Sequence, residues 1–442
     1  MSLIQLHHCV SADIRRGHVH RRDFLRGIST AGLAAGTLSW TDLMTAQATE
    51  LRKRGMACIL LWMQGGPSQF ETFSPKPGHA NGGETKAIAT NVNGIQIAEN
   101  FPNMAKMMGE AAIIRSMTSK EGSHPRASYL LHTGYLPTAS VKYPSIGSLV
   151  ASELSDPKSQ LPSFVRIGGR GGNSSGAGFL GVQFDPFDVQ NPSSPPTNTQ
   201  PASDVARYQR RLSLLDRLQA DFAREAPDVV ADHKKLYDRA ARMVLSSDMK
   251  AFDLSQESAK VRESYGEGQF AAGCLLARRL VEAGVRFVQV NDDGWDHHAS
   301  IRDGLPKKCR QVDRPIAGLI TDLKARGLLE ETLVIWGGEF GRTPFDQDLS
   351  LGKAPEENRG REHNPRGFTM WLAGGGVKGG LVHGATDDFA FQAVDGKVHM
   401  HDLHATILHL LGLDHEKLTY RYSGRDFRLT DVYGRVVTEI LA

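Results

Sequence analysis

The sequence predicts an α/β protein in which a mostly parallel sheet is covered by helices on both faces. Mostly apolar runs of five to seven residues recur along the chain and are typical of strands buried on both sides. Amphipathic helical patterns separate these runs, and alternating strands and helices indicate a parallel sheet. At 442 residues, with 40% apolar and 23% charged residues, the chain can bury a sizeable core, and collagen, coiled coil and bulk disorder are excluded.

Six buried strands are expected in chain order. The first, at 57–63, ends at Gly65-Gly66-Pro67, which is a turn signal. The other five are expected at 111–115, 163–167, 285–290, 332–336 and 368–373. Helices are expected between and after them, at 145–154, 268–283, 315–325 and 403–411.

One block departs from this alternation. Residues 185–201 are rich in Pro, Ser and Asn, which indicates a loop. Two charged amphipathic patterns follow at 204–225 and 227–250, with no strand between them. We therefore expect residues 185–262 to form an α-helical insertion within one α/β domain spanning 49–442.

Residues 1–48 are expected to be a twin-arginine export signal. Arg21-Arg22 precede Phe24-Leu25-Arg26, and a weakly apolar stretch of small residues follows at 27–40. That stretch is too short and too polar to span a bilayer, which requires about 20 apolar residues. Ala46-Gln47-Ala48 fits a cleavage site, which predicts a periplasmic or extracellular mature chain. An uncleaved anchor and a chance arginine pair are the alternatives.

Charge and cysteine content exclude several functions. Residues 1–48 contain five Arg and three Asp, so 47 basic and 46 acidic residues remain, and nothing favours nucleic-acid binding. Three cysteines remain without paired spacing, so no disulfide framework is expected. With 17 histidines against four cysteines in the whole chain, any metal site should use imidazole and carboxylate ligands.

Polar residues follow several expected strands, at the sheet edge where α/β proteins bind ligands. Asp296 and His298 follow the strand at 285–290, and Glu339 and Arg342 follow the strand at 332–336. Two further clusters are Arg361-Glu362-His363 and the segment 399–404, which contains His404. Each cluster alone is more often solvated than metallated, but together they predict a divalent cation site. Zn²⁺ or Mn²⁺ suits this mixture better than Ca²⁺, which is not excluded.

A fifth segment, 123–137, follows a buried strand and begins a helix. Backbone N–H groups and Arg126 at such a helix start would receive an anion, although a simple capped helix explains the pattern equally well. The chain has no G-x-S-x-G elbow, no Walker loop, and no G-x-G-x-x-G between a strand and a helix.

Together these segments resemble the exported DUF1501 proteins. The resemblance covers nearly the whole of 49–442 and includes the twin-arginine start, Leu61 to Phe73, Trp295-Asp296-His297-His298, Glu339 to Thr343, Gly360 to His363 and Gly424 to Val432. That family is related to the alkaline-phosphatase and sulfatase superfamily, which implies a three-layer α/β/α sandwich with an alkaline-phosphatase-like core. Its own biochemical activity is largely undefined.

The superfamily resemblance also implies roles for single residues. Aligning the sulfatase nucleophile segment on Pro125 gives that position to Ser123, whereas aligning on Thr133-Gly134 gives it to His124. The sulfatase Asp-His-Gly is here Glu339-Phe340-Gly341, so an imidazole is lost, and His363 is a candidate replacement.

The first strand should end in a metal-binding Asp, yet Gln64 stands there. Glu71 is the nearest carboxylate and the candidate replacement. Arg126 and Arg342 are the candidates for clamping an oxyanion.

The leading hypothesis is therefore a metal-assisted hydrolase of sulfate or phosphate esters, acting on a small molecule or glycan. Its catalytic candidates are Ser123, His124, Arg126 and Arg342, and its metal candidates are Glu71, Asp296, His298, Glu339, His363 and His404. The alternative is a non-catalytic relative that binds a glycan or a cell-envelope partner. Neither nucleic acid nor a transmembrane segment after the signal is expected, and the oligomeric state is open.

Overall fold

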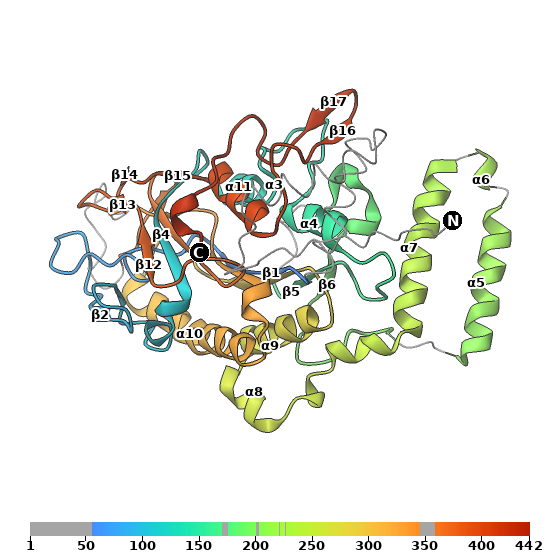
Figure 1. The fold of residues 1–442 in the computed structure, drawn as a ribbon, viewed down its shortest axis with the longest axis horizontal. Helices are drawn as coiled ribbons and strands as arrows, with labels where there is room; N and C mark the ends of the chain where they lie inside the picture. Colours follow the sequence, from blue (N-terminus) through green and yellow to red (C-terminus); the bar gives the residue numbers. More distant parts are fainter. Residues whose placement is uncertain (1–54, 170–175, 200–202, 221, 226, 345–358) are drawn as a thin grey trace, which may run out of the picture. The chain divides into compact units, whose positions relative to one another are not determined.

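The centre of the protein, seen in a computed structural model, is a nine-stranded mixed sheet (Figure 1). The structure describes residues 55–169, 176–199, 203–220, 222–225, 227–344 and 359–442. The expected export signal lies outside these residues. The sheet order is β12-β4-β11-β8-β1-β7-β5-β6, and β15 also pairs with β4. Its strands are β1 (Ala57–Gln64), β4 (Ala111–Thr118), β5 (Phe164–Ile167), β6 (Phe187–Val189), β7 (Phe287–Asp293), β8 (Thr332–Gly337), β11 (Phe368–Ala373), β12 (Leu381–His383) and β15 (Val398–His399).

The strand pairing is parallel with one exception. β1 pairs in parallel with both β7 and β8, whereas β11 runs antiparallel to β4 and β8. All six expected strands are present, within three residues of the expected limits. Because β1, β7 and β8 are neighbouring parallel strands, their carboxyl ends meet at one edge of the sheet.

Helices cover both faces of this sheet. In β1, Ile59 and Leu61 pack with α9 (Gln269–Glu282) and α10 (Ile301–Ala325), while Leu60 and Trp62 pack on the opposite face. That second face is covered by α3 (His124–Thr133), α4 (Ile146–Leu154) and α11 (Met400–Leu410). Figure 1 shows the two helical layers on either side of the strands. The alternation of side chains along a fully buried strand thus confirms the expected three-layer sandwich.

Helix α10 differs from its prediction at 315–325. It begins at Ile301 and continues through Pro306 and Pro315. Packing against α9 and the sheet outweighs the hydrogen bonds that the two prolines cannot donate, so the helix extends further toward its N-terminus than the pattern predicts.

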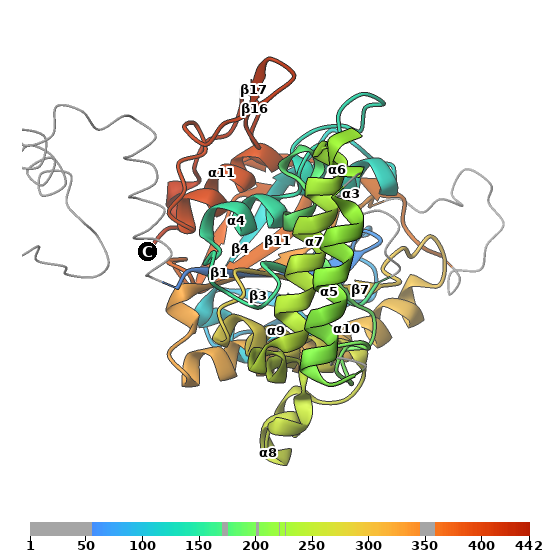
Figure 2. The same ribbon diagram turned by 90° about the vertical axis from the view of Figure 1, so that its right-hand side faces the viewer.

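The expected helical insertion contains α5 (Val205–Gln219), α6 (Phe222–Glu225), α7 (Pro227–Leu245) and α8 (Ala259–Tyr265). Figure 2 shows α5 and α7 side by side, joined by an ion pair between Lys234 and Asp216. The range 185–262 also holds β6, an edge strand that was not predicted because its three residues are too short to form a pattern.

Small two-stranded sheets complete the fold. The one formed by β9 (Gly341–Arg342) and β10 (His363–Asn364) lies beyond the end of β8 and is used below. The others pair β2 (Ala87–Ala89) with β3 (Gln96–Ala98), β13 (Ala385–Thr386) with β14 (Ala393–Asp395), and β16 (Tyr420–Tyr422) with β17 (Arg425–Phe427). No helix among the described residues is long and apolar enough to cross a membrane.

Candidate metal centre

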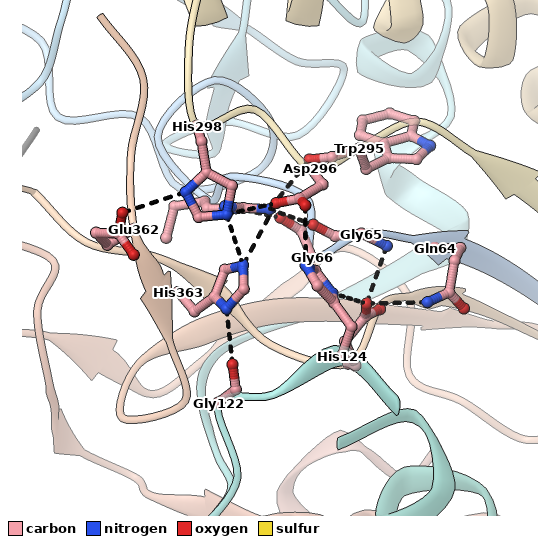
Figure 3. A network of polar contacts seen from close by, with 12 residues as sticks. Gln64, Gly65, Gly66, Gly122, His124, Trp295, Asp296, His298, Glu362 and His363 are labelled. Atoms are coloured by element: carbon pink, nitrogen blue, oxygen red, sulfur yellow. Dashed lines mark hydrogen bonds and ion pairs between the residues drawn. The ribbon is translucent and has the colours of Figure 1, made fainter. Parts of the chain in front are cut away.

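Four side chains meet beyond the carboxyl ends of β1, β7 and β8. They are His124, Asp296, His298 and His363, hereafter the histidine–aspartate cluster, and each offers a ligand atom within 4.8 Å of the others (Figure 3). His124 is the first residue of α3, His363 begins β10, and the other two lie in the loop that follows β7. Sheet topology therefore joins residues that lie up to 239 positions apart.

The three imidazoles all turn Nε2 toward the carboxylate of Asp296. Nε2 of His298 lies 2.9 Å from Oδ1, and Nε2 of His363 lies 3.3 Å from the same oxygen. Nε2 of His124 lies 3.1 Å from Oδ2, and the Nε2 atoms of His298 and His363 are 2.9 Å apart. Two imidazole nitrogens this close cannot both carry a proton toward each other, so at least one presents a lone pair.

The opposite nitrogen of each ring has its own acceptor. Nδ1 of His124 lies 2.6 Å from Oε1 of Glu339, and Nδ1 of His298 lies 3.2 Å from Oε1 of Glu362. Nδ1 of His363 lies 2.7 Å from the carbonyl oxygen of Gly122. A neutral ring that donates from Nδ1 leaves a lone pair on Nε2, which is the arrangement found in histidine ligands of metals.

Arg342 holds the carboxylate of Asp296 in place. The guanidinium is fully buried, and its Nη2 donates to Oδ1 of Asp296 at 2.6 Å. Its remaining donors bind the carbonyl oxygens of Gly65, Gly66 and Arg361. Because the guanidinium is fully buried and each of its three nitrogens donates to a protein oxygen, Arg342 orients Asp296; its role as an oxyanion clamp stays a prediction.

These contacts change the acidity of both partners. Burial disfavours charge on each group, but hydrogen bonds from His124, His363 and Arg342 hold the pKa of Asp296 well below its usual range. Burial likewise opposes charge on His124, yet Asp296 and Glu339 raise the pKa of its imidazole to about 9. The Asp296 carboxylate is thus ionised and the His124 imidazole is protonated at neutral pH. The positive charge on His124 balances the carboxylate, as a bound cation would.

Local sequence explains how the loops reach this position. Gly65 follows β1 with φ +120°, and a Cβ there would lie 2.5 Å from the backbone nitrogen of Asp296. Only glycine permits that approach. Gln64, found where a metal-binding Asp was expected, donates from Nε2 to Oε1 of Glu339 at 3.2 Å. Phe340, found where an imidazole was expected, packs its ring 4.4 Å from that of His363.

Three of the six metal candidates lie outside the cluster. Glu71 is 4% exposed and forms an ion pair with Arg361 at 2.9 Å. His404 lies in the core beneath α3, where its Nε2 donates to the carbonyl oxygen of Leu131 at 2.7 Å. Glu339, a third candidate, contacts the cluster through His124 and does not face its centre.

The nucleophile segment is also divided by the structure. His124 belongs to the cluster, whereas Ser123 is exposed at the N-cap of α3 and no cap hydrogen bond from its side chain is formed. Arg126 is exposed and paired with Glu121 at 2.6 Å. Of the four catalytic candidates, His124 belongs to the cluster and Arg342 bonds to its Asp296, whereas Ser123 and Arg126 form no hydrogen bond or ion pair with it in the described structure.

Glu362 and the Gly122 carbonyl, which orient His298 and His363, were not among the site residues predicted from the sequence. Glu362 directly precedes His363 and belonged to a cluster already noted, so adjacency was the available signal. Gly122 acts through its backbone, which leaves no trace in side-chain type.

The cluster suits a divalent cation that accepts nitrogen ligands. Three imidazoles and one carboxylate match Zn²⁺ or Mn²⁺ better than the oxygen cage of Ca²⁺. The cluster side chains are 21 to 42% exposed, so a cation there would keep a position open to solvent. A cation that displaces the proton of His124 would thus face three Nε2 lone pairs and the ionised Asp296, and it could also bind an exchangeable ligand.

Comparison with known proteins adds a family and several distant structures. The model described as "Protein of unknown function (DUF1501)" matches residues 56–441. No curated protein matches the sequence. Similar solved structures include the PsFucS1 sulfatase from Pseudoalteromonas sp. (16% identity, 86% of this chain and 72% of that chain covered, TM-score 0.39). They also include the lipoteichoic acid synthase LtaP from Listeria monocytogenes (9%, 87% and 80%, 0.37) and an alkaline phosphatase from the Antarctic bacterium TAB5 (13%, 80% and 98%, 0.33).

Proposed function

Since the chain belongs to the DUF1501 family of proteins of unknown function, its chemistry has to come from its own residues, and we propose that it is a metal-dependent hydrolase of sulfate or phosphate esters. One observation carries the proposal: three imidazoles with Nδ1 held by fixed acceptors direct Nε2 at one ionised carboxylate. Histidine ligands of metals have this arrangement, in which a hydrogen bond from Nδ1 fixes the ring and leaves Nε2 to bind the metal.

Two roles are assigned to the residues of the site: binding the cation and keeping its ligands in position. His124, His298, His363 and Asp296 would be its ligands. A divalent cation held there supplies Lewis acidity, which polarises an ester oxygen and favours loss of a proton from water at neutral pH. The carboxylate and its buried Arg342 partner keep the ligand geometry fixed, so the site needs little reorganisation during reaction.

The attacking group in this proposal is water. Within the described residues, the hydrogen bonds of the four cluster side chains go to one another, Arg342, Glu339, Glu362 and Gly122, and none goes to a hydroxyl or thiol. Water would add to sulfur or phosphorus while the ester oxygen leaves with a proton, and no covalent enzyme intermediate would form.

The test compares metal content and turnover in matched variants. We expect the purified protein to hold about one equivalent of Zn²⁺ or Mn²⁺ by mass spectrometry and to hydrolyse an aryl sulfate or an aryl phosphate. His298→Ala should lose both metal and turnover, while His409→Ala, an exposed histidine on α11, should keep both. Metal-free wild-type protein, or His298→Ala that turns over substrate normally, would refute the proposal.

A second candidate is a non-catalytic binding protein. It is favoured by the burial of Arg342, whose three nitrogens all donate to protein oxygens, because no other described guanidinium or ammonium group bonds to the cluster and would receive equatorial oxygens. Stoichiometric metal without turnover of any aryl sulfate or phosphate would support this candidate.

We also propose export through the twin-arginine pathway, on the strength of Arg21-Arg22 and the small-residue stretch that follows. Replacing both arginines with lysine should leave the protein in the cytoplasmic fraction of a cell with that pathway. Unchanged fractionation would contradict it.

A further inference from the structure

A pocket lies beside the histidine–aspartate cluster. Its volume is about 400 Å³, and it is lined by residues 71, 80–81, 83–85, 99–100, 301–303, 306, 344 and 359–361. A volume of this size accommodates a small-molecule ligand. Nothing in the cluster chemistry described so far uses it.

The pocket and the cluster share a wall. Gly360 and Arg361 line the pocket, and the next two residues, Glu362 and His363, belong to the metal centre. The backbone nitrogen of Arg361 donates to the carbonyl oxygen of His297 at 3.0 Å, and its carbonyl accepts from Arg342. A ligand in the pocket would therefore lie next to a group bound at the cluster.

The floor of the pocket is a built polar site. Arg361 is 6% exposed, donates to Oε1 of Glu71 from Nε and Nη2 at 3.1 and 2.9 Å, and stacks 3.9 Å from the ring of Phe70. Oε2 of Glu71 is buried without a hydrogen-bond partner. Gly83, at φ +71°, covers this pair, since a Cβ there would lie 3.3 Å from the guanidinium.

The charges of the lining argue for one chemical class of ligand. Four carboxylates and three guanidiniums line the pocket, and one exposed pair, Glu84 with Arg302, stands at 3.2 Å. The carboxylates would repel a multiply charged anion, and the guanidiniums would repel a cation. An apolar molecule would remove water from both kinds of group without replacing its hydrogen bonds. Neighbouring donors and acceptors match the vicinal hydroxyls of a sugar, which offers both roles without net charge.

We propose that this pocket binds a neutral sugar unit, and, resting on the proposed hydrolase function, that this sugar carries or adjoins the ester placed at the cluster. The inference assigns the pocket a recognition role and the cluster a chemical role. The buried Glu71–Arg361 pair would orient the ring, and the shared wall would set the distance from ring to ester.

Binding is tested at equilibrium, apart from turnover. The full mature chain, loaded with Zn²⁺, is applied to a glycan microarray, and the best glycan is titrated by calorimetry. Thr85→Trp and Ala80→Trp fill the pocket and should each weaken binding about tenfold or more. Ala89→Trp, exposed on the neighbouring β2 and outside the lining, should bind as wild type. Melting temperature and metal content of each variant report on folding.

The outcomes separate this inference from the proposed function. Glycan binding that both pocket variants abolish supports the pocket, whether or not an aryl ester is hydrolysed. No glycan above background, or binding unchanged in both variants, overturns it. Spermidine that displaces the glycan would also overturn it, because the pocket would then select a cation. Loss of aryl-ester turnover bears only on the hydrolase proposal.

Discussion

Glu339 offers the sharpest test of the metal centre, because it acts on the cation only through His124. The carboxylate is fully buried and accepts from Nδ1 of His124 at 2.6 Å and from the backbone nitrogen of Gly65 at 3.0 Å. In Glu339→Gln, the amide oxygen can still accept these two bonds and the one from Gln64, so shape and tautomer survive while the negative charge is lost.

The size of the effect follows from that bond. A hydrogen bond to a buried charged acceptor contributes about 1.5 to 3 kcal/mol, and one to a neutral amide about 0.5 to 1.5 kcal/mol. The difference, about 1 to 1.5 kcal/mol, corresponds to a roughly tenfold weaker cation affinity. This agrees with the loss of about 10- to 100-fold in metal affinity that follows replacement of a residue hydrogen-bonded to a metal ligand.

The assay is Zn²⁺ competition against a chromophoric chelator, with Glu362→Gln as the matched variant. Glu362 is 40% exposed and lies 3.2 Å from His298, so solvent screens it and its replacement should cost less than that of Glu339. Equal affinities for wild type and Glu339→Gln, at unchanged melting temperature, would refute the role of Nδ1 acceptors. A larger effect of Glu362→Gln would refute the importance of burial.

Four other outcomes are expected. Burial lowers the pKa of His404 to about 3 and of His132 to about 4, so the unfolded chain binds protons first on acidification. Stability in urea should be intact above pH 6.5 and fall below it by about 1.4 kcal/mol per pH unit for each histidine, and a slope unaltered in His404→Phe would contradict this. Arg342→Met leaves buried carbonyls and a carboxylate unpaired and should cost about 3 to 5 kcal/mol in urea unfolding; less than about 1 kcal/mol would show the guanidinium is dispensable. Gly65→Ala should lower melting temperature and metal content more than Gly94→Ala, which has the same sign of φ but open space; equal effects would exclude the steric cause. A chelator should lower the melting temperature, since a cation at about 100 times its Kd adds about 2.7 kcal/mol, and an unchanged melting curve would mean that no cation binds the native state.

Much of the sheet was predictable because its strands are buried on both sides. The run at 368–373 was located to the residue, since β11 is buried throughout, is apolar except for Thr369, and is bounded by glycines. Strand order was not predictable: β11 runs antiparallel between β4 and β8, and no local pattern distinguishes that direction. Local apolar patterns thus predict the fold class, whereas the order of the strands depends on contacts between segments far apart in the sequence.

The candidate site divides in the same way. Asp296 and His298 were found because they follow a strand whose end points to the binding edge. Glu71 was a plausible ligand by proximity in sequence, but Arg361, 290 residues later, holds it instead. His404 lies on the buried face of α11 beside Leu403, so helix periodicity turns it into the core. Residue type and strand position therefore nominate ligands, and tertiary partners decide among them.

The separation of the cluster residues along the chain also bears on mechanical integrity. Cys58, Cys274 and Cys309 are all buried and unpaired, so no disulfide joins the described segments. Burial raises the pKa of each thiol, which keeps it unreactive. A cation bound by residues 124, 296, 298 and 363 would close loops of about 170 and 65 residues at a single atom, and closing long loops restricts the unfolded chain most. The metal would then be a reversible cross-link, formed only after folding has brought three chain segments together and opened by chelation without any change in redox conditions.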